Sequence, residues 1–292
     1  MSICYRRLPR FDYVKPERLS EALEILRGNK NGRFKVYAGG TDVIPKIKGR
    51  VMPAPDALVD LKGIEELDYI SHDEKDGLRI GALVSIHDVA HDPVVKEKFS
   101  MLAHAAASIA SIQVQNRGTI AGNICNAVPS ADSIPALLCL GAKALCEGSQ
   151  GERVIDLEAF FTGPSRTVLG EDELLKEIHI PSIPGKGVYI KLSPRTRMDL
   201  AVVGVAVFAD VKDGIFKDIR IGLGAVAPTT IRAKKSEKRL MGGRLSDKLI
   251  EEAAAMAAKE AKPIDDHRAS ALYRRMMVAV LVKKAIGQII SN

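Results

Sequence analysis

Tryptophan is absent from this 292-residue sequence, and aromatic residues together make up only 4% of it. Single-stranded nucleic acids are commonly held by stacking on aromatic side chains, and no RNA- or DNA-binding signature is present. The net charge of +7 is compatible with anionic partners. However, the basic residues are scattered along expected helices. Solvated helix faces or subunit contacts explain this distribution at least as well as nucleic-acid binding does. We therefore expect no nucleic-acid partner.

Metal-binding and hydrolytic motifs are also missing. None of the four cysteines (Cys4, Cys125, Cys139 and Cys146) forms a Cys-x-x-Cys pair, and the six histidines show no His-Glu-x-x-His pattern. There is no Walker-type phosphate loop and no Gly-x-Ser-x-Gly nucleophile elbow. We predict reduced thiols, no metal site, no iron–sulfur cluster and no catalytic acid–base pair in this chain.

Long apolar runs are the third absence. No run approaches the roughly 18–20 residues that a membrane-spanning helix needs. The basic residues Arg6 and Arg7 are not followed by the apolar segment of a secretory signal. The sequence thus predicts a cytoplasmic protein without a membrane span.

Two loops of small residues stand out, Tyr37–Asp42 (Tyr-Ala-Gly-Gly-Thr-Asp) and Arg117–Leu138. Glycine lets a backbone approach a ligand closely, and amides and hydroxyls supply directed hydrogen bonds. Composition alone fits an ordinary surface turn equally well for the second loop. Because each loop is expected to follow a strand-like run, we interpret the pair as able to hold one extended phosphate ligand.

The first half of the chain shows alternating helical and strand-like patterns. Pro16–Gly28 predicts a helix with an apolar face, and Arg33–Ala38 alternates as a strand that leads into Gly39. Ser85 and Asp88 have capping-box spacing. Thr119 and Ile120 are expected to form a short extended piece, and Asp132 to cap a helix that begins at Ser133.

The second half predicts strands and then helices, as in an α+β domain. The expected strands are Leu174–Ile180, Gly187–Leu192, Ala201–Val211 and Ile215–Ala225, and Asp213-Gly214 between the last two is a hairpin signal. Helices are expected at about 231–240, 246–261 and 269–290. Gly222–Ala227 formally matches a dinucleotide-binding fingerprint. We reject that function because Pro228 and Thr229-Thr230 leave no helix opening directly from the glycines, and because no acidic residue lies about 20 positions on. We expect a sheet edge there instead.

Together these residues resemble a known family. Ala38-Gly-Gly-Thr-Asp42, Thr119-Ile-Ala-Gly-Asn-Ile124 with Pro129 to Pro135 beyond it, and Lys191-Leu-Ser-Pro-Arg-Thr-Arg-Met-Asp-Leu-Ala201 are similar to the flavin-binding medium subunit of molybdenum hydroxylases. That group includes carbon monoxide dehydrogenase, xanthine dehydrogenase, nicotinate dehydrogenase and 4-hydroxybenzoyl-CoA reductase. The resemblance covers the whole chain.

The resemblance implies an α+β fold with two domains. Residues 1–175 would form an FAD-binding domain of the vanillyl-alcohol-oxidase (PCMH) type, with subdomains at about 1–55 and 56–175, and residues 176–292 a C-terminal α+β domain. Ala121 replaces a glycine common in the family, and we do not expect its methyl group to block the flavin. The implied FAD-binding residues are Val36, Tyr37, Ala38, Gly39, Gly40, Thr41, Asp42, Thr119, Ile120, Gly122, Asn123, Asn126, Asp132 and Lys191.

The implied function is electron transfer by an oxidoreductase subunit. A small partner subunit would carry [2Fe–2S] clusters and a large one the molybdenum cofactor, while FAD in this chain would pass electrons to an external acceptor such as NAD or a quinone. Two alternatives remain open at this point. The first is a stand-alone flavin oxidoreductase of the same fold. The second is a nucleotide-binding module without redox function.

Overall fold

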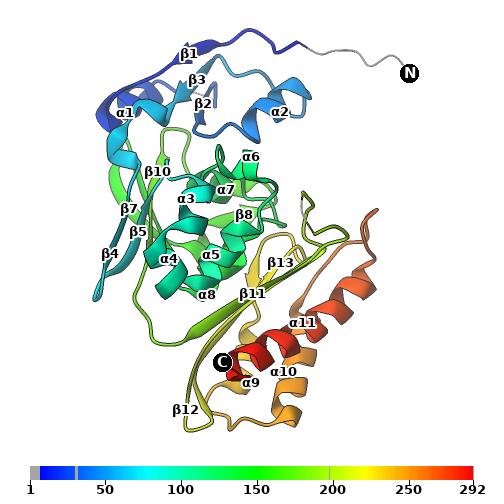
Figure 1. The fold of residues 1–292 in the computed structure, drawn as a ribbon. Helices are drawn as coiled ribbons and strands as arrows, with labels where there is room; N and C mark the ends of the chain where they lie inside the picture. The colour runs from blue at the N-terminus through cyan, green and yellow to red at the C-terminus, as the bar shows by residue number, and fades with distance from the viewer. Residues whose placement is uncertain (1–6, 30–31, 197, 292) are drawn as a thin grey trace.

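The computed structural model describes residues 7–29, 32–196 and 198–291. Figure 1 shows three parts stacked along the long axis of the molecule, from the N-terminal part at the top to the C-terminal helices at the bottom. Within the described residues, none of the helices combines the length and apolar character that crossing a bilayer requires. Cys4 lies outside the described residues.

The N-terminal subdomain is a small parallel sheet in the order β1-β3-β2, with two helices. Its strands and helices are β1 (Asp12–Val14), α1 (Leu19–Arg27), β2 (Phe34–Tyr37), α2 (Val43–Lys48) and β3 (Ala57–Asp60). The predicted apolar face of the first helix is confirmed, because Ala22, Leu23 and Leu26 are buried. Two single-turn 3-10 helices, Leu61–Gly63 and Glu65–Leu67, lead out of this subdomain.

The middle subdomain is an antiparallel sheet in the order β4-β5-β10-β6-β7, packed against short helices. The strands are β4 (Ile70–Asp73), β5 (Gly77–Gly81), β6 (Lys143–Gly148), β7 (Gly151–Asp156) and β10 (Leu174–Ile180). The helices are α3 (Ile86–His91), α4 (Pro93–Lys98), α5 (Ser100–Ala107), α6 (Ile112–Gln115), α7 (Ile120–Asn126) and α8 (Ser133–Cys139). A 3-10 turn (Leu157–Ala159) precedes a hairpin of β8 (Phe161–Gly163) and β9 (Arg166–Thr167).

The C-terminal domain places helices against one antiparallel sheet, in the order β11-β12-β13-β14. Its strands are β11 (Lys186–Leu192), β12 (Val203–Lys212), β13 (Ile215–Gly224) and β14 (Ile231–Arg232), and its helices are α9 (Lys234–Leu240), α10 (Asp247–Glu260) and α11 (Ala271–Ser291). The hairpin signal is confirmed: Asp213 and Gly214 join β12 to β13, both with positive φ (53° and 70°). β11 runs between the middle helices and α11 in Figure 1.

Several expectations differ from the structure. β10, which the sequence grouped with the strands of the second half, pairs with β5 and β6 of the middle sheet. Ser85 caps α3 as predicted, by accepting the Asp88 N–H. The predicted extended piece is confirmed at Thr119, whose backbone is extended and forms an antiparallel bridge with Ser85, but it is wrong at Ile120. Thr119 is the N-cap of α7, and Ile120 is its first helical residue. The domain boundary placed between residues 175 and 176 remains a prediction.

The expected sheet edge at Gly222 is also wrong. β13 lies between β12 and β14 there, and α8 packs on it so closely that a Cβ atom at Gly222 would be 2.5 Å from the Pro135 carbonyl oxygen. A Cβ at Gly224 would be 2.9 Å from the Pro135 ring. The two glycines thus allow a middle-subdomain helix to approach the C-terminal sheet, and this contact fixes the two parts relative to each other.

Candidate functional site

The first glycine loop runs from the end of β2 into α2. Its residues from Val36 to Thr41 are half-buried and Asp42 is exposed. Gly40 has φ = +72°, and a Cβ atom there would be 2.2 Å from the Tyr37 ring, so a side chain is excluded on two grounds. Lys62, which the sequence reasoning did not single out, donates a hydrogen bond of 3.0 Å to the Ala38 carbonyl and lies 3.8 Å from the centre of the Tyr37 ring.

The second loop forms the start of α7. The Thr119 hydroxyl accepts the Gly122 N–H at 2.9 Å, so it caps the helix and keeps its own O–H free to donate. Ile120 is fully buried and can offer a ligand only backbone atoms. Ala121 is buried in the core as well, so its methyl group points away from the solvent-exposed backbone of Gly122.

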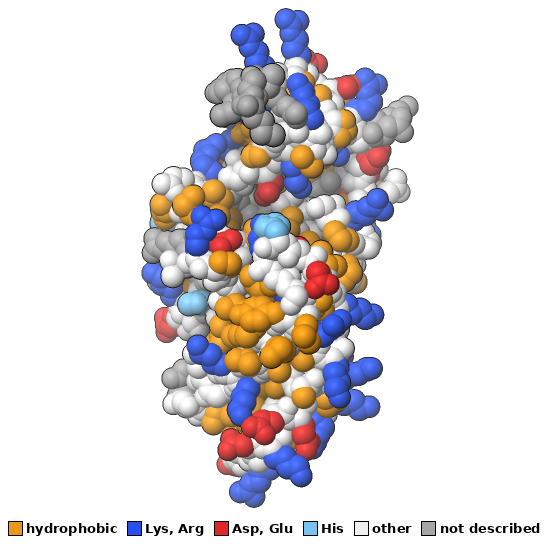
Figure 2. All heavy atoms as spheres, turned by 90° about the vertical axis from the view of Figure 1, so that its right-hand side faces the viewer, with side chains coloured by type: hydrophobic (Ala, Val, Ile, Leu, Met, Phe, Trp, Pro, Cys, Tyr) orange, Lys and Arg blue, Asp and Glu red, His pale blue; other side chains and the backbone are white. Residues whose placement is uncertain are grey.

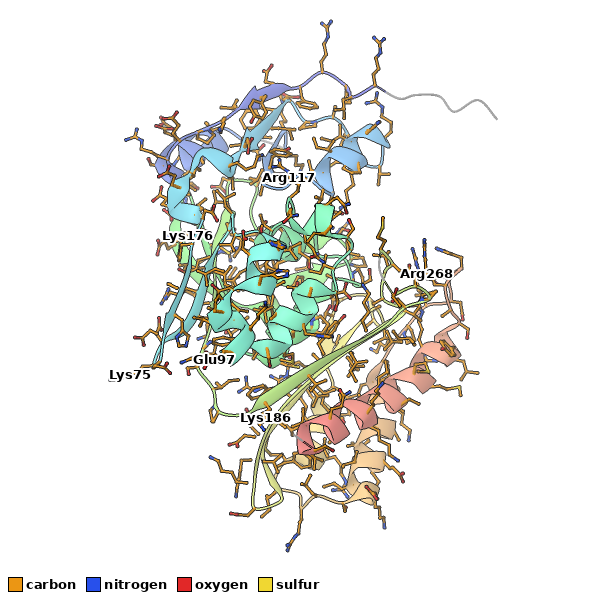
Figure 3. All side chains as sticks on the ribbon, viewed as in Figure 1. Lys75, Glu97, Arg117, Lys176, Lys186 and Arg268 are labelled. Atoms are coloured by element: carbon orange, nitrogen blue, oxygen red, sulfur yellow. The ribbon has the colours of Figure 1, made fainter. Side chains whose placement is uncertain are left out.

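The two loops lie in direct contact, as the sequence predicted. A Cβ atom on Gly39 would be 1.9 Å from the Arg117 carbonyl oxygen and 2.7 Å from the Gly118 Cα, so the two backbones touch. Farther along, the Lys46 ammonium hydrogen-bonds the Asn126 side-chain oxygen, across 80 residues of sequence. Figure 3 places Arg117 where the N-terminal subdomain faces the helices of the middle subdomain.

Two further predicted residues, Asn123 of α7 and Asp132 before α8, make side-chain contacts. The Asn123 side-chain oxygen accepts a 2.8 Å hydrogen bond from the Ser133 hydroxyl, which fixes the amide and leaves its N–H groups to donate elsewhere. The expected capping role of Asp132 is wrong, because its side chain makes no cap hydrogen bond. Its carboxylate turns instead toward β11 of the C-terminal domain.

A buried polar cluster joins α8 to β11. Asp132 accepts hydrogen bonds from the Tyr189 hydroxyl (2.7 Å) and from the Lys191 ammonium (2.8 Å), and Lys191 also donates to the Ser108 carbonyl (2.9 Å). Burial raises the pKa of Asp132 above its usual value, although Lys191 and Tyr189 oppose the shift. Burial and the neighbouring Asp132 raise the pKa of Tyr189 well above its usual value, so its hydroxyl remains protonated and donates.

Lys46, Lys62 and Tyr189 are the neighbours that the sequence reasoning missed. Tyr189 had a usable signal, because it precedes Lys191 by two positions in an expected strand and therefore shares its face. Lys46 and Lys62 had none, because their roles depend on loops that meet only in the fold. Lys62 and Lys191 are paired with Asp60 and Asp132, so Lys46 is the lysine that adds net positive charge to this site. The loops also offer backbone N–H groups and hydroxyls, which together suit an anionic, extended ligand.

The end of the site near Lys191 opens into a groove of about 1340 Å³. Ser108, Ala110, Gln115, Tyr189 and Lys191 are among the residues that line it. Within the part of the chain that the structure describes, no group of three or more His, Cys, Asp and Glu side chains is placed to hold a metal ion. Burial raises the pKa of the Cys139 thiol to about 12 and that of Cys146 to about 11, so neither is a ready thiolate.

Two protein families match this chain over nearly its whole length. Residues 9–183 match the family described as "FAD binding domain in molybdopterin dehydrogenase", and residues 188–289 match "CO dehydrogenase flavoprotein C-terminal domain". The first match contains both glycine loops and Asp132, and the second contains Tyr189 and Lys191. The buried cluster is thus assembled from both matched regions.

Individual relatives are similar over their full length. The medium chain of glyceraldehyde dehydrogenase from Sulfolobus acidocaldarius is 36% identical, covering 96% of this chain and 99% of the relative. The medium chain of carbon monoxide dehydrogenase from Hydrogenophaga pseudoflava is 35% identical and covers 96% of both. A solved structure of that carbon monoxide dehydrogenase superposes with a TM-score of 0.93 at 33% identity, covering 98% of this chain and 99% of the other. The chain therefore belongs to the family of FAD-binding medium subunits of molybdenum hydroxylases, which are flavoprotein subunits of oxidoreductases.

Proposed function

We propose that FAD lies across the contact between the two loops, with its pyrophosphate between Gly39–Asp42 and Thr119–Asn126 and its flavin ring toward Asp132 and Lys191. The observation that supports this placement best is the backbone contact between Gly39 and the Arg117–Gly118 peptide. The donor groups also fit the ligand: backbone N–H groups, the Thr119 hydroxyl and the Lys46 ammonium match phosphate oxygens. The full set of proposed contacts is Val36, Tyr37, Ala38, Gly39, Gly40, Thr41, Asp42, Thr119, Ile120, Gly122, Asn123, Asn126, Asp132 and Lys191.

FAD would supply the redox chemistry, and the protein would supply position and charge. The hydrogen bond from Tyr189 and the ion pair with Lys191 fix the Asp132 carboxylate, and the Ser108 carbonyl orients the Lys191 ammonium. A carboxylate and an ammonium held in this way offer an acceptor and a donor to the polar edge of a flavin ring. An external acceptor, such as NAD or a quinone, would then take the electrons from the flavin.

The proposed setting is a cytoplasmic complex. A small subunit with [2Fe–2S] clusters would deliver electrons to this chain, and a large subunit with the molybdenum cofactor would oxidise the substrate. The relatives named above are medium chains of dehydrogenases, which favours this function over a stand-alone flavin enzyme. If the isolated chain turned over an organic electron donor, that result would contradict the subunit role. The assembly is tested separately, by copurification of this chain with one large and one small subunit.

The absorbance spectrum tests the FAD proposal directly. We expect the purified chain to show the visible bands of an oxidised flavin, and the released cofactor to be FAD when it is separated from the denatured protein by chromatography. Adding FAD to flavin-free protein at about 100 times its dissociation constant should raise the free energy of unfolding by about 2.7 kcal/mol. A chain that binds adenine nucleotides but takes up no flavin would instead be a nucleotide-binding module.

A further inference from the structure

The outward face of α11 is apolar although it is exposed. Leu272, Met276 and Val280 follow one another at intervals of four residues, and their exposed fractions are 68%, 59% and 54%. Tyr273 beside them is also exposed. Residues at this spacing lie on one side of a helix, so the four side chains form a continuous strip. We call Leu272, Tyr273, Met276 and Val280 the α11 strip.

The α11 strip is not needed to hold the helix in place. The opposite side of α11 is buried in the core of the C-terminal domain through residues that include Val278, Val282 and Ile286. A helix on the surface of a globular protein normally exposes a polar face, and a helix that is apolar on both faces is usually covered on both. The composition of α11 therefore indicates that its outer face is covered by another molecule.

The α11 strip is continuous with a second group of exposed apolar residues near the proposed flavin site. Met198 and Leu200 lie on the loop after β11, and the Met198 N–H donates to the Ala110 carbonyl (3.1 Å), a residue that lines the groove beside Lys191. The Arg274 guanidinium, from the N-terminal half of α11, donates to the Val202 carbonyl at 2.7 Å. The Met198 bond places the loop at the wall of the groove, and the bond of the buried Arg274 anchors the end of the same loop to α11.

The figures show this surface on one side of the molecule. Figure 2 views the right-hand side of Figure 1, where the first half of α11 lies, and hydrophobic side chains gather there in one patch, with many basic and fewer acidic side chains around it. Figure 3 places Arg268 at the same side, next to the start of α11. Single exposed apolar residues are normal on a monomer, but a gathered patch rimmed by charge is typical of a docking site.

Charge decides between a second copy of this chain and a different partner. The 21 residues of α11 include no Asp or Glu. The charged side chains on its exposed side are the basic Arg275, Lys283 and Lys284, of which Lys283 is paired with Glu251 of α10. A two-fold dimer formed through this surface would bring the same patch of both copies together, and therefore like charges. A partner with an apolar centre and a rim of carboxylates complements the surface instead.

We propose that the α11 strip, together with Met198 and Leu200, is the surface on which the [2Fe–2S] subunit docks through an apolar patch rimmed by acidic side chains. This inference rests on the proposed function, in which that subunit delivers electrons to the flavin. An electron donor has to sit close to its acceptor, and this surface begins at the groove into which the Asp132–Lys191 end of the site opens. A standard interface buries about 800 Å² per partner, so the strip would be its apolar centre and the basic residues its rim.

The test is pairwise capture of the cognate [2Fe–2S] subunit, coexpressed with the full chain. We expect the double variant Leu272→Glu/Met276→Glu to capture at least about tenfold less small subunit than the wild type does. The two substitutions place carboxylates in the apolar centre of the surface, where they also face the acidic rim of the partner. Met276→Lys should weaken capture less than Met276→Glu. Val154→Glu is the matched control, because Val154 is 61% exposed on β7, on the other side of the molecule.

FAD content and melting temperature should be unchanged in all four variants, which separates docking from folding. Small-subunit capture by the double variant at the wild-type level would overturn the proposal. So would a wild-type dimer of this chain that the double variant converts to a monomer, since a second copy would then occupy the surface. If the wild type captures no small subunit while it binds FAD, the proposed assembly itself is wrong and this docking surface falls with it.

Discussion

Replacing Gly39 by alanine is expected to reduce FAD retention at least about tenfold, which corresponds to about 1.4 kcal/mol of binding free energy. The added methyl carbon would be 1.9 Å from the Arg117 carbonyl oxygen and 2.6 Å from its carbonyl carbon. Both are backbone atoms, so no side-chain rotation can relieve the overlap, and the two loops have to move apart. Because the proposed FAD site spans these loops, their separation removes contacts on both sides of the pyrophosphate at once.

The measurement is the amount of flavin per chain after gel filtration, with the melting temperature of the flavin-free protein recorded alongside. Overpacking of this kind also destabilises the fold, by roughly 1–3 kcal/mol, so the flavin-free protein must be shown to remain folded. Gly163→Ala is the matched control, because a Cβ atom at Gly163 meets nothing within 4 Å. If Gly39→Ala retains as much flavin as the control, close contact between the loops is not a requirement for binding.

The local parts of this site could be predicted because local chemistry determines them. α1 follows from an apolar repeat, the β12–β13 hairpin from Asp213-Gly214, and the first glycine loop from a strand that runs into Gly39-Gly40. In each of these segments the residue pattern and the final conformation agree. The pairing of the two loops was an interpretation from their shared small-residue composition, which the family resemblance then supported, since nothing in the residues of either loop specifies its partner.

The wrong expectations share a physical cause, which is competition from distant residues. Asp132 has the right type and position to cap α8, but the Tyr189 hydroxyl and the Lys191 ammonium hold its carboxylate from strand β11. Gly222 resembled a sheet-edge residue, but it is needed because Pro135 packs against the sheet at that point. Neither partner is visible from a window of neighbouring sequence, so pattern reasoning favoured the local alternative.

Replacing Lys191 by methionine is expected to lower the free energy of unfolding of the flavin-free chain by roughly 3–5 kcal/mol at neutral pH. The ion pair is shielded from water, since the side chains of Lys191 and Asp132 are only 13% and 7% exposed. Removing the ammonium leaves a buried carboxylate whose remaining side-chain partner is the neutral Tyr189 hydroxyl. The measurement is urea unfolding of flavin-free protein, followed by circular dichroism at several pH values.

The loss should depend on pH in a defined direction. Burial already raises the pKa of Asp132 in the folded chain, and loss of Lys191 raises it further. A carboxyl group whose folded pKa exceeds its unfolded value of about 3.9 binds more protons when folded, so its contribution to stability falls as the pH rises through the interval between the two. The penalty of Lys191→Met should therefore shrink as the pH is lowered through this interval, and it should be smallest below about 3.9, where Asp132 is protonated in both states.

A second substitution separates the charge from the packing. Asp132→Asn removes the buried charge and keeps an oxygen that accepts the Tyr189 hydrogen bond, so the double variant Asp132→Asn/Lys191→Met should lose only about 1 kcal/mol, with little pH dependence. Lys234→Met is the control, because Lys234 and Glu158 form an ion pair of 2.9 Å whose side chains are 52% and 47% exposed, and such pairs contribute about 0–1 kcal/mol. Equal losses in Lys191→Met and Lys234→Met, or additive losses in the double variant, would mean that Lys191 does not act by neutralising Asp132. The pairing of these two residues across α8 and β11 would then be a matter of packing alone.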